Sequence, residues 1–199
     1  MSTIRLSSSW FGDAEIEAVS RVLLAQKVSM GSEVKQFEDE LLSFFGRKDA
    51  NVSCVSSCTA ALHLALQASG IGSGDDVLVP TFTFVATFQA ISATGARPIP
   101  CDIDLDDGFI DIDDARSRVT RSTKAIVPVL FAGCDEKIYR LHQLAEDYGL
   151  KIVEDAAHSF GNEKIASRNS VLCFSFDAIK NISCGDGGAI LTSDDEIAN

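Results

Sequence analysis

The 199-residue sequence lacks several patterns that would assign it to a large functional class. It contains neither a Walker glycine–lysine motif nor the dinucleotide pattern G-x-G-x-x-G, so these two kinds of nucleotide site lose support. Its six cysteines form no C-x-x-C pair and no ligand-like spacing, which argues against a metal site. No apolar run approaches the roughly 18 residues that span a membrane, and residues 1–5 do not resemble a signal peptide.

Positive charge is also scarce, since 17 Lys and Arg residues face 29 Asp and Glu residues and the net charge is -12. This balance argues against nucleic acids and anionic membranes as partners. A phosphorylated ligand stays compatible with it, because a helix N-terminus can make a pocket locally positive. A hydrophobic content of 46% is enough for one substantial domain with a large core. We expect a soluble cytoplasmic protein whose cysteines are buried or half-buried thiols (Cys54, Cys58, Cys101, Cys134, Cys173 and Cys184).

Helical and strand-like segments alternate along the chain. Apolar residues at helical spacing predict four helices: one capped by Asp13, one from about Thr59 to Gly70, one over 84–93, and one opened by Asp135 and ended by Gly149. Short β-branched runs predict seven strands: 51–55, 76–80, 97–101, 125–130, 151–154, 171–175 and 189–192. This order predicts an α/β fold, with a mostly parallel seven-stranded sheet covered by helices on both faces. Few residues separate the last two strands, which favours an antiparallel final strand.

The most informative residues are Lys180 and Asp155. Lys180 follows a predicted strand and precedes a glycine-rich turn over 185–188, and Asp155 ends an earlier strand. A lysine amine can bind pyridoxal phosphate (PLP) covalently, and a carboxylate can keep the pyridine nitrogen of PLP protonated, so that its ring accepts electrons. Asp155 could equally cap a helix, and lysines follow many strands. The pair therefore indicates a PLP site only in combination with the other motifs of the sequence.

Four further features lie where strands are expected to end, at the edge where α/β sheets bind ligands. The segment 56–62 could hold a phosphate at a helix N-terminus or be an ordinary Ser/Thr cap. Phe84 could stack on a flat heterocycle or belong to the core, and His158 could face a ligand or be structural. Ser175 could donate to a phosphate, and alternation along the strand predicts that Glu154 points away from Asp155.

Taken together, these segments resemble the DegT/DnrJ/StrS family of PLP-dependent nucleotide-sugar aminotransferases, which have fold type I. The resemblance rests on the joint order of the segments 30–34, 37–38, 57–66, 79–87, 101–104, 154–158, 174–176, 180–181 and 185–189. It implies the large domain of an aspartate aminotransferase-like transferase, a three-layer α/β/α fold.

The resemblance also implies roles for individual residues. Lys180 matches the lysine that binds the cofactor and shuttles the proton, and Asp155 matches the partner of the pyridinium nitrogen. Phe84 matches the aromatic residue stacked on the ring, and His158 the residue near the phenolic oxygen. Cys58, Thr59 and Ser175 match the phosphate ligands. No metal is implied.

At the level of the whole protein, the resemblance implies transfer of an amino group, from an amino acid such as glutamate, to a keto group of a nucleotide-linked sugar. Such chemistry belongs to polysaccharide biosynthesis. The family's smaller C-terminal domain has no counterpart here, so residues 1–199 are expected to be a truncated PLP-binding large domain of a homodimer.

The sequence departs from the family pattern at Cys58, at 177–179 and at 131–133, and the last departure concerns contacts to the substrate. Alternatives left open are a PLP lyase, a non-catalytic PLP-binding or regulatory protein, and an inactive fragment.

Overall fold

The computed structural model describes residues 7, 9–162, 165 and 170–198. Within them the strands are β1 (Asn51–Val55), β2 (Asp76–Pro80), β3 (Arg97–Cys101), β4 (Thr123–Ile126), β5 (Lys151–Asp155), β6 (Val171–Ser175) and β7 (Gly188–Thr192). The helices are α1 (Asp13–Leu24), α2 (Ser32–Phe44), α3 (Cys58–Ala68), α4 (Val85–Ala93), α5 (Ile112–Ser117), α6 (Ile138–Tyr148) and α7 (Asp195–Ala198), with a short 3-10 turn, η1 (Phe131–Gly133).

All seven strands form one sheet in the order β1-β7-β6-β5-β4-β2-β3. The pairs β2–β3, β2–β4, β4–β5 and β5–β6 are parallel, whereas β7 is antiparallel to both β1 and β6. The predicted α/β class and the mostly parallel sheet are therefore confirmed, as is the antiparallel final strand. The 12 residues between Ser175 and Gly188 hold turns, bends and one isolated bridge between Asp177 and Gly185 but no helix, so the chain reverses directly into β7.

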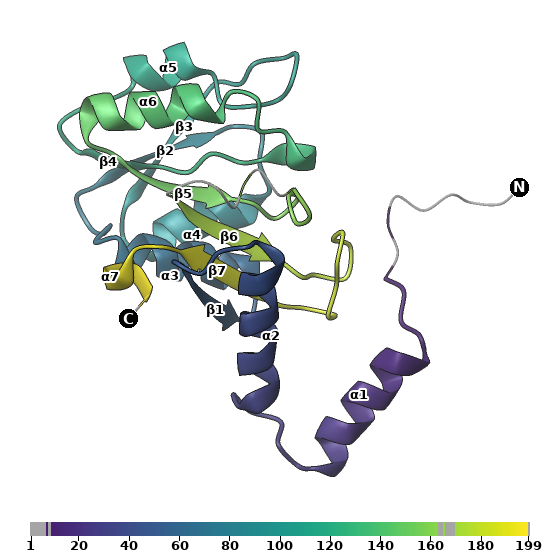
Figure 1. The fold of residues 1–199 in the computed structure, drawn as a ribbon. Coiled ribbons are helices and arrows are strands. Elements are labelled where there is room, and N and C mark those ends of the chain that lie inside the picture. Colours follow the sequence, from purple (N-terminus) through teal and green to yellow (C-terminus); the bar gives the residue numbers. More distant parts are fainter. Residues whose placement is uncertain (1–6, 8, 163–164, 166–169, 199) are drawn as a thin grey trace, which may run out of the picture.

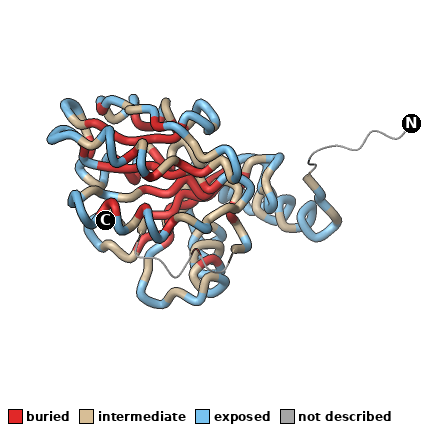
Figure 2. Tube along the Cα trace, turned by 90° about the horizontal axis from the view of Figure 1, so that it is seen from above, coloured by how far each residue is buried: buried red, intermediate tan, exposed pale blue. Residues whose placement is uncertain are grey.

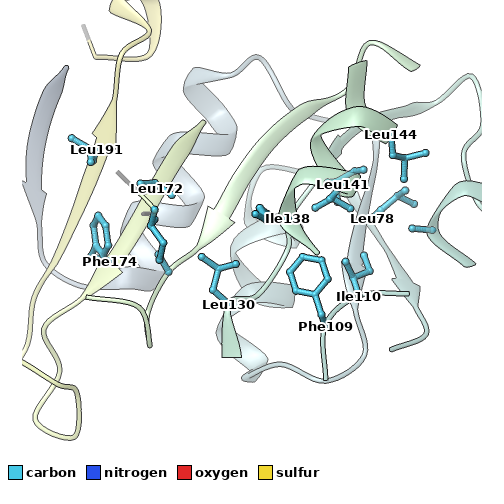
Figure 3. Packing of buried hydrophobic residues seen from close by; sticks show 14 of the residues in the cluster. Leu78, Phe109, Ile110, Leu130, Ile138, Leu141, Leu144, Leu172, Phe174 and Leu191 are labelled. Carbon is cyan, nitrogen blue, oxygen red and sulfur yellow. The ribbon is translucent and has the colours of Figure 1, made fainter. Parts of the chain in front are cut away.

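Helices cover both faces of this sheet (Figure 1). Alternate residues of each central strand enter different cores, as Leu78 and its neighbours Val77 and Val79 do in β2. One core contains residues of α2, α5 and α6, and Figure 3 shows Leu141 and Leu144 of α6 among its members. The other contains residues of α3 and α4. Figure 2 shows the buried strands as a band between the more exposed helices, which makes the fold a three-layer α/β/α structure.

Helix α1 differs from the other long helices because none of its residues is buried. It stands off from the sheet and its covering helices in Figure 1. Its apolar residues Ile16, Val19 and Leu23 are each about 60% exposed. The helix therefore presents an apolar stripe that no described part of the chain covers.

Several predicted boundaries were wrong. The fourth strand ends at Ile126, not at residue 130, because Pro128 has no N–H to continue the ladder. Gly12, not Asp13, is the N-cap of α1, and α6 begins at Ile138, three residues beyond Asp135. Helices α2 and α5 were not predicted. Cys184 is exposed, whereas the other five cysteines are buried or half-buried as expected.

The longest described helix, α2, has 13 residues, and no helix in the described ranges meets the length and apolarity that crossing a bilayer requires. The same residues contain no group of His, Cys, Asp and Glu side chains arranged to hold a metal ion.

Candidate active site

A cavity of about 690 Å³ lies at the edge of the sheet where β5 and β6 end and β7 begins. Its volume is typical of small-molecule sites. Parallel strands bring their carboxyl ends to one edge, so the residues that follow different strands meet there. All seven residues singled out from the sequence line this cavity: Cys58, Thr59, Phe84, Asp155, His158, Ser175 and Lys180.

The start of α3 forms one end of the cavity. Ser57 is the N-cap, and its hydroxyl accepts a hydrogen bond from the Ala60 amide at 3.2 Å. The amides of Cys58 and Thr59, at the first two helical positions, have no acceptor within the helix and are available to an anion. The Ser/Thr cap and the anion site are therefore compatible readings of this segment. Burial raises the pKa of the Cys58 thiol well above its usual value, so this residue offers its amide and not a thiolate.

Gly188 permits the close packing at this end. A Cβ atom at this position would lie 2.5 Å from the carbonyl carbon of Ser57 and 2.7 Å from the Cys58 nitrogen. No side chain fits at such distances. The first residue of β7 therefore sets the position of the Ser57–Cys58 peptide at the mouth of α3.

Asp155, the last residue of β5, is 6% exposed and contacts both helices on its face of the sheet. Its Oδ2 accepts a hydrogen bond from the Thr87 hydroxyl of α4 at 2.8 Å, and its Oδ1 lies 4.0 Å from the Cys58 sulfur of α3. Oδ1 also accepts from the Ala157 amide at 3.2 Å. No helix directly follows Asp155, so the alternative that it caps one is wrong.

Glu154, the preceding residue, points to the opposite face, as alternation predicted. It is fully buried and contacts His142 of α6 at 3.2 Å, and Ser170 donates to it at 2.5 Å. Two adjacent carboxylates of one strand thus have separate surroundings, and only Asp155 reaches the cavity.

Opposing effects act on the charge of Asp155. Burial raises the pKa of its carboxyl group, whereas the hydrogen bonds from Thr87 and Ala157 lower it. The nearby Lys180 and His158 lower this pKa further. Burial is the larger effect, so the pKa stays raised, and the hydrogen-bond donors and the charge of Lys180 offset only part of it.

Lys180 lies in the loop between β6 and β7, where its amide donates to the Asp177 carbonyl at 2.9 Å. It is half-buried, and its positive charge affects the pKa values of both Asp155 and His158. Ser175 precedes this loop at the end of β6; it is 5% exposed, and its hydroxyl accepts from the Asp177 amide at 3.4 Å.

His158 contacts the turn η1 on the other side of the cavity. The Ala132 amide donates to its Nδ1 at 3.4 Å, and Phe131 packs against its ring with the centroids 5.3 Å apart. Burial and the charge of Lys180 lower the pKa of His158, and Asp155 raises it by less, so the net effect favours the neutral imidazole. Because Nδ1 accepts a hydrogen bond, the proton of the neutral ring lies on Nε2.

Phe84 is 77% exposed at the N-cap of α4, so its assignment to the core is wrong. An aromatic ring left exposed beside a cavity is available to a ligand. Phe82 and Phe131 form a second aromatic contact, 4.6 Å between centroids, in the same wall.

Sequence reasoning missed Thr87, which is 1% exposed and the first-turn residue of α4 that reaches Asp155. The two residues are 68 positions apart, and no local pattern relates them.

The sequence of this chain is similar to those of known proteins. Residues 11–199 match the sequence profile of the DegT/DnrJ/EryC1/StrS aminotransferase family. The chain belongs to that family.

Solved structures agree with this assignment to the DegT/DnrJ/EryC1/StrS family. DesV from S. venezuelae is 38% identical, with 93% of this chain and 51% of DesV covered and a TM-score of 0.87. NtdA from Bacillus subtilis, solved with bound pyridoxamine phosphate (PMP), is 31% identical over 100% of this chain and 48% of its own, with a TM-score of 0.88. Spr1654 from Streptococcus pneumoniae is named as a candidate sugar aminotransferase and was solved in a PLP form. It is 30% identical, the match covers 95% of this chain and 53% of Spr1654, and the TM-score is 0.87. The chain spans about half the length of these structures.

The family is PLP-dependent, and the residues of this cavity fit such a cofactor. Free amides at the start of α3 suit its phosphate, and a close-packed glycine, Gly188, shapes that end. A buried carboxylate, Asp155, has hydrogen-bond donors but no ion-pair partner among the described salt bridges, which suits a cationic ring nitrogen. An amine, Lys180, lines the same cavity.

Proposed function

We propose that this protein is a PLP-dependent aminotransferase that moves an amino group from an amino acid to a keto group of a nucleotide-linked sugar. The observation that carries the proposal is the convergence of Lys180, Asp155 and the start of α3 on one cavity. Membership in an aminotransferase family supports the reaction class, and the likeness to Spr1654 supports a sugar substrate. Glutamate as the donor rests on the resemblance alone.

Each end of the cavity has its own task in this proposal. The amides of Cys58 and Thr59, with the Ser175 hydroxyl, hold the phosphate, and Asp155 pairs with the ring nitrogen. When bound, PLP supplies an electron sink that stabilises the negative charge left on a substrate carbon after loss of its proton.

Lys180 has two tasks. Its amine would hold the cofactor covalently, and it would also take the proton from the substrate carbon and return it, as a general base and acid. The Nε2–H of His158, set by the Ala132 amide, is a donor for the phenolic oxygen. Phe84, which is exposed in the cavity wall, would stack on the flat ring of the cofactor.

We also propose that residues 1–199 form the PLP-binding large domain of a longer, homodimeric chain. The match to only about half of each related structure supports this view. The uncovered apolar stripe of α1 and the exposed Phe84 at the cavity are consistent with further protein packing there. A PLP lyase, or a non-catalytic PLP-binding protein, would use the same cofactor contacts but has no support from the matched family.

Borohydride reduction of the PLP-loaded protein, followed by peptide mass mapping, tests the anchor. The pyridoxyl group is expected on Lys180, and Lys180→Ala is expected to lose both the label and transamination. Lys151→Ala is the matched control, because Lys151 begins β5 at the opposite edge of the sheet. Labelling of another lysine in the parent would overturn the assignment.

Transamination by the full chain, measured with glutamate and a panel of nucleotide-linked keto-sugars, tests the substrate. Turnover of keto acids but of no keto-sugar would leave the cofactor chemistry standing and refute the sugar substrate.

A further inference from the structure

Two threonine hydroxyls on one side of Asp155 form a hydrogen-bonded chain. Thr87 donates to Asp155 Oδ2 at 2.8 Å, and the Thr83 hydroxyl lies 2.7 Å from the Thr87 hydroxyl. Thr87 is 1% exposed, whereas Thr83 is half-buried and lines the cavity. These hydrogen bonds therefore lead from the cavity wall, through the first turn of α4, to the carboxylate at the end of β5.

The protons in this chain can be placed by counting donors. Each threonine hydroxyl has one proton, and a carboxylate can only accept. If Asp155 is ionised, Thr87 must donate to it and can then only accept from Thr83. The Thr83 hydroxyl also lies 3.4 Å from the Phe84 carbonyl, but the 2.7 Å contact with Thr87 is the shorter of the two. Thr83 therefore donates to Thr87, and both hydroxyl dipoles point their positive ends toward Asp155. Such an aligned chain polarises its members and strengthens the terminal bond to the carboxylate.

We propose that Thr87, backed by Thr83, is a positioning residue that holds Asp155 as an oriented anion for the cationic ring of the cofactor. The inference rests on the proposed function of the cavity. It adds a residue that does not line the cavity and that acts only through Asp155.

A purely structural role is the competing explanation, because the same bond ties the start of α4 to β5. The two explanations differ in their pH dependence. The titratable groups that face Asp155 are Lys180, His158, Cys58 and Cys173. None of the four is altered by a change at Thr87, so a new pH dependence must come from Asp155.

The sign of that dependence follows from the surroundings of Asp155. Burial raises the pKa of Asp155 and the Thr87 hydrogen bond lowers it, so loss of the hydroxyl raises this pKa further. At pH values below the raised pKa, more of the variant's Asp155 is protonated and cannot pair with a cationic ring. The variant should therefore bind the cofactor worst at low pH and approach the parent as the pH rises.

The test compares Thr87→Val, which keeps the shape but loses the hydroxyl, with Thr87→Ser, which keeps the hydroxyl. PLP affinity is titrated by absorbance for the full chain between about pH 6 and pH 9, and the variant-to-parent ratio of Kd cancels the cofactor's own titration. Thr87→Val is expected to weaken binding by about tenfold or more at the low end, since hydrogen bonds to charged groups are stronger than neutral ones. Thr87→Ser should stay within about threefold of the parent.

Thr192→Val is the matched control. Thr192 is 4% exposed in β7, and its hydroxyl accepts from the Asp194 amide, away from Asp155. It should lower the thermal stability of the cofactor-free protein without changing PLP affinity at any pH. If Thr87→Val fails to fold, Thr83→Val removes the outer hydroxyl and should give the same pH trend at about threefold.

A Kd ratio for Thr87→Val that is independent of pH, or equal to that of Thr192→Val, would overturn the positioning role and leave the proposed function intact. A Kd ratio for Thr83→Val that does not change with pH would have the same consequence. A parent that binds no PLP at any pH would instead overturn the proposed function, and this inference with it.

Discussion

Replacement of Asp155 by asparagine separates the chemical role of this residue from any structural one. Asn has nearly the same shape, but Asp155 accepts from Thr87 at Oδ2 and from Ala157 at Oδ1, and Asn has only one side-chain oxygen. If that oxygen keeps the Ala157 amide, the side-chain NH2 group faces the Thr87 hydroxyl, which can accept from it. The substitution therefore removes the negative charge and reverses the hydrogen bond with Thr87, while it keeps the volume of the side chain.

The direction of the expected change in stability follows from the pKa of Asp155. Burial, the largest influence, raises the pKa of Asp155 in the folded protein above its unfolded value. The folded state then binds more protons than the unfolded state in the window between these two pKa values, so stability falls as the pH rises through it. Above that window the buried charge costs about 1.4 kcal/mol for each unit of the shift. Asp155→Asn should therefore be neutral or stabilising for the cofactor-free protein at neutral pH.

The expected effect on catalysis has the opposite sign. Two unit charges about 3 Å apart attract each other by about 5 kcal/mol at an effective dielectric constant of about 20. Asn keeps part of this through its dipole, so we expect a loss of about 3 to 4 kcal/mol, or about 10²- to 10³-fold in turnover. The pH dependence of the absorbance of bound PLP should also differ from that of the parent, because the ring nitrogen loses its anionic partner.

The measurements are urea unfolding of the cofactor-free protein and steady-state transamination by the full chain. Glu154→Gln is the matched control, since it neutralises the adjacent buried carboxylate on the other face of β5. It should change stability but not turnover. Turnover of Asp155→Asn equal to that of the parent would refute the pairing of Asp155 with the cofactor, and a stability loss equal to its activity loss would indicate a structural role.

Two further predictions concern packing. Gly188→Ala should lower the free energy of unfolding by about 2 kcal/mol and weaken PLP binding, because its Cβ would lie 2.5 Å from Ser57; urea titration measures the first effect. Gly72→Ala, whose Cβ would have its nearest neighbour at 3.8 Å, is the control, and equal effects of the two changes would contradict the packing argument. The 199-residue chain alone should self-associate and show little catalysis, and serine substitutions in the apolar stripe of α1 should reduce the association seen by light scattering (Ile16, Val19 and Leu23). A monomeric, fully active chain of this length would refute the proposal that a longer, dimeric protein completes the site.

Much of the fold could be predicted from local sequence. Helix α3 was located because Ala61, Leu62, Ala65 and Leu66 repeat at helical spacing and face the core. Strands such as β2 and β6 were found with their observed bounds, because each contains a short run of consecutive apolar residues, 77–79 and 171–174, and such short runs between turn signals favour strands. Helix α2 was missed although Val34, Phe37 and Leu41 have helical spacing, which shows that this signal is readily overlooked among many charged residues.

The members of the site could also be predicted, since each follows a strand or begins a helix and the order of the motifs is that of the family. What the sequence could not determine is how they are arranged. The order of strands in the sheet, the side chains that Glu154 and Asp155 meet on their two faces, and the exposure of Phe84 depend on contacts between distant segments.

The contacts that tune the site were decided by tertiary structure alone. Thr87 meets Asp155 across 68 residues, and Gly188 meets Ser57 across the junction of β7 with α3. Periodicity reports which side of an element faces the core, because that depends on neighbours three or four residues away. It carries no information about which other element lies on that side, because that depends on packing and hydrogen bonding summed over the whole folded chain.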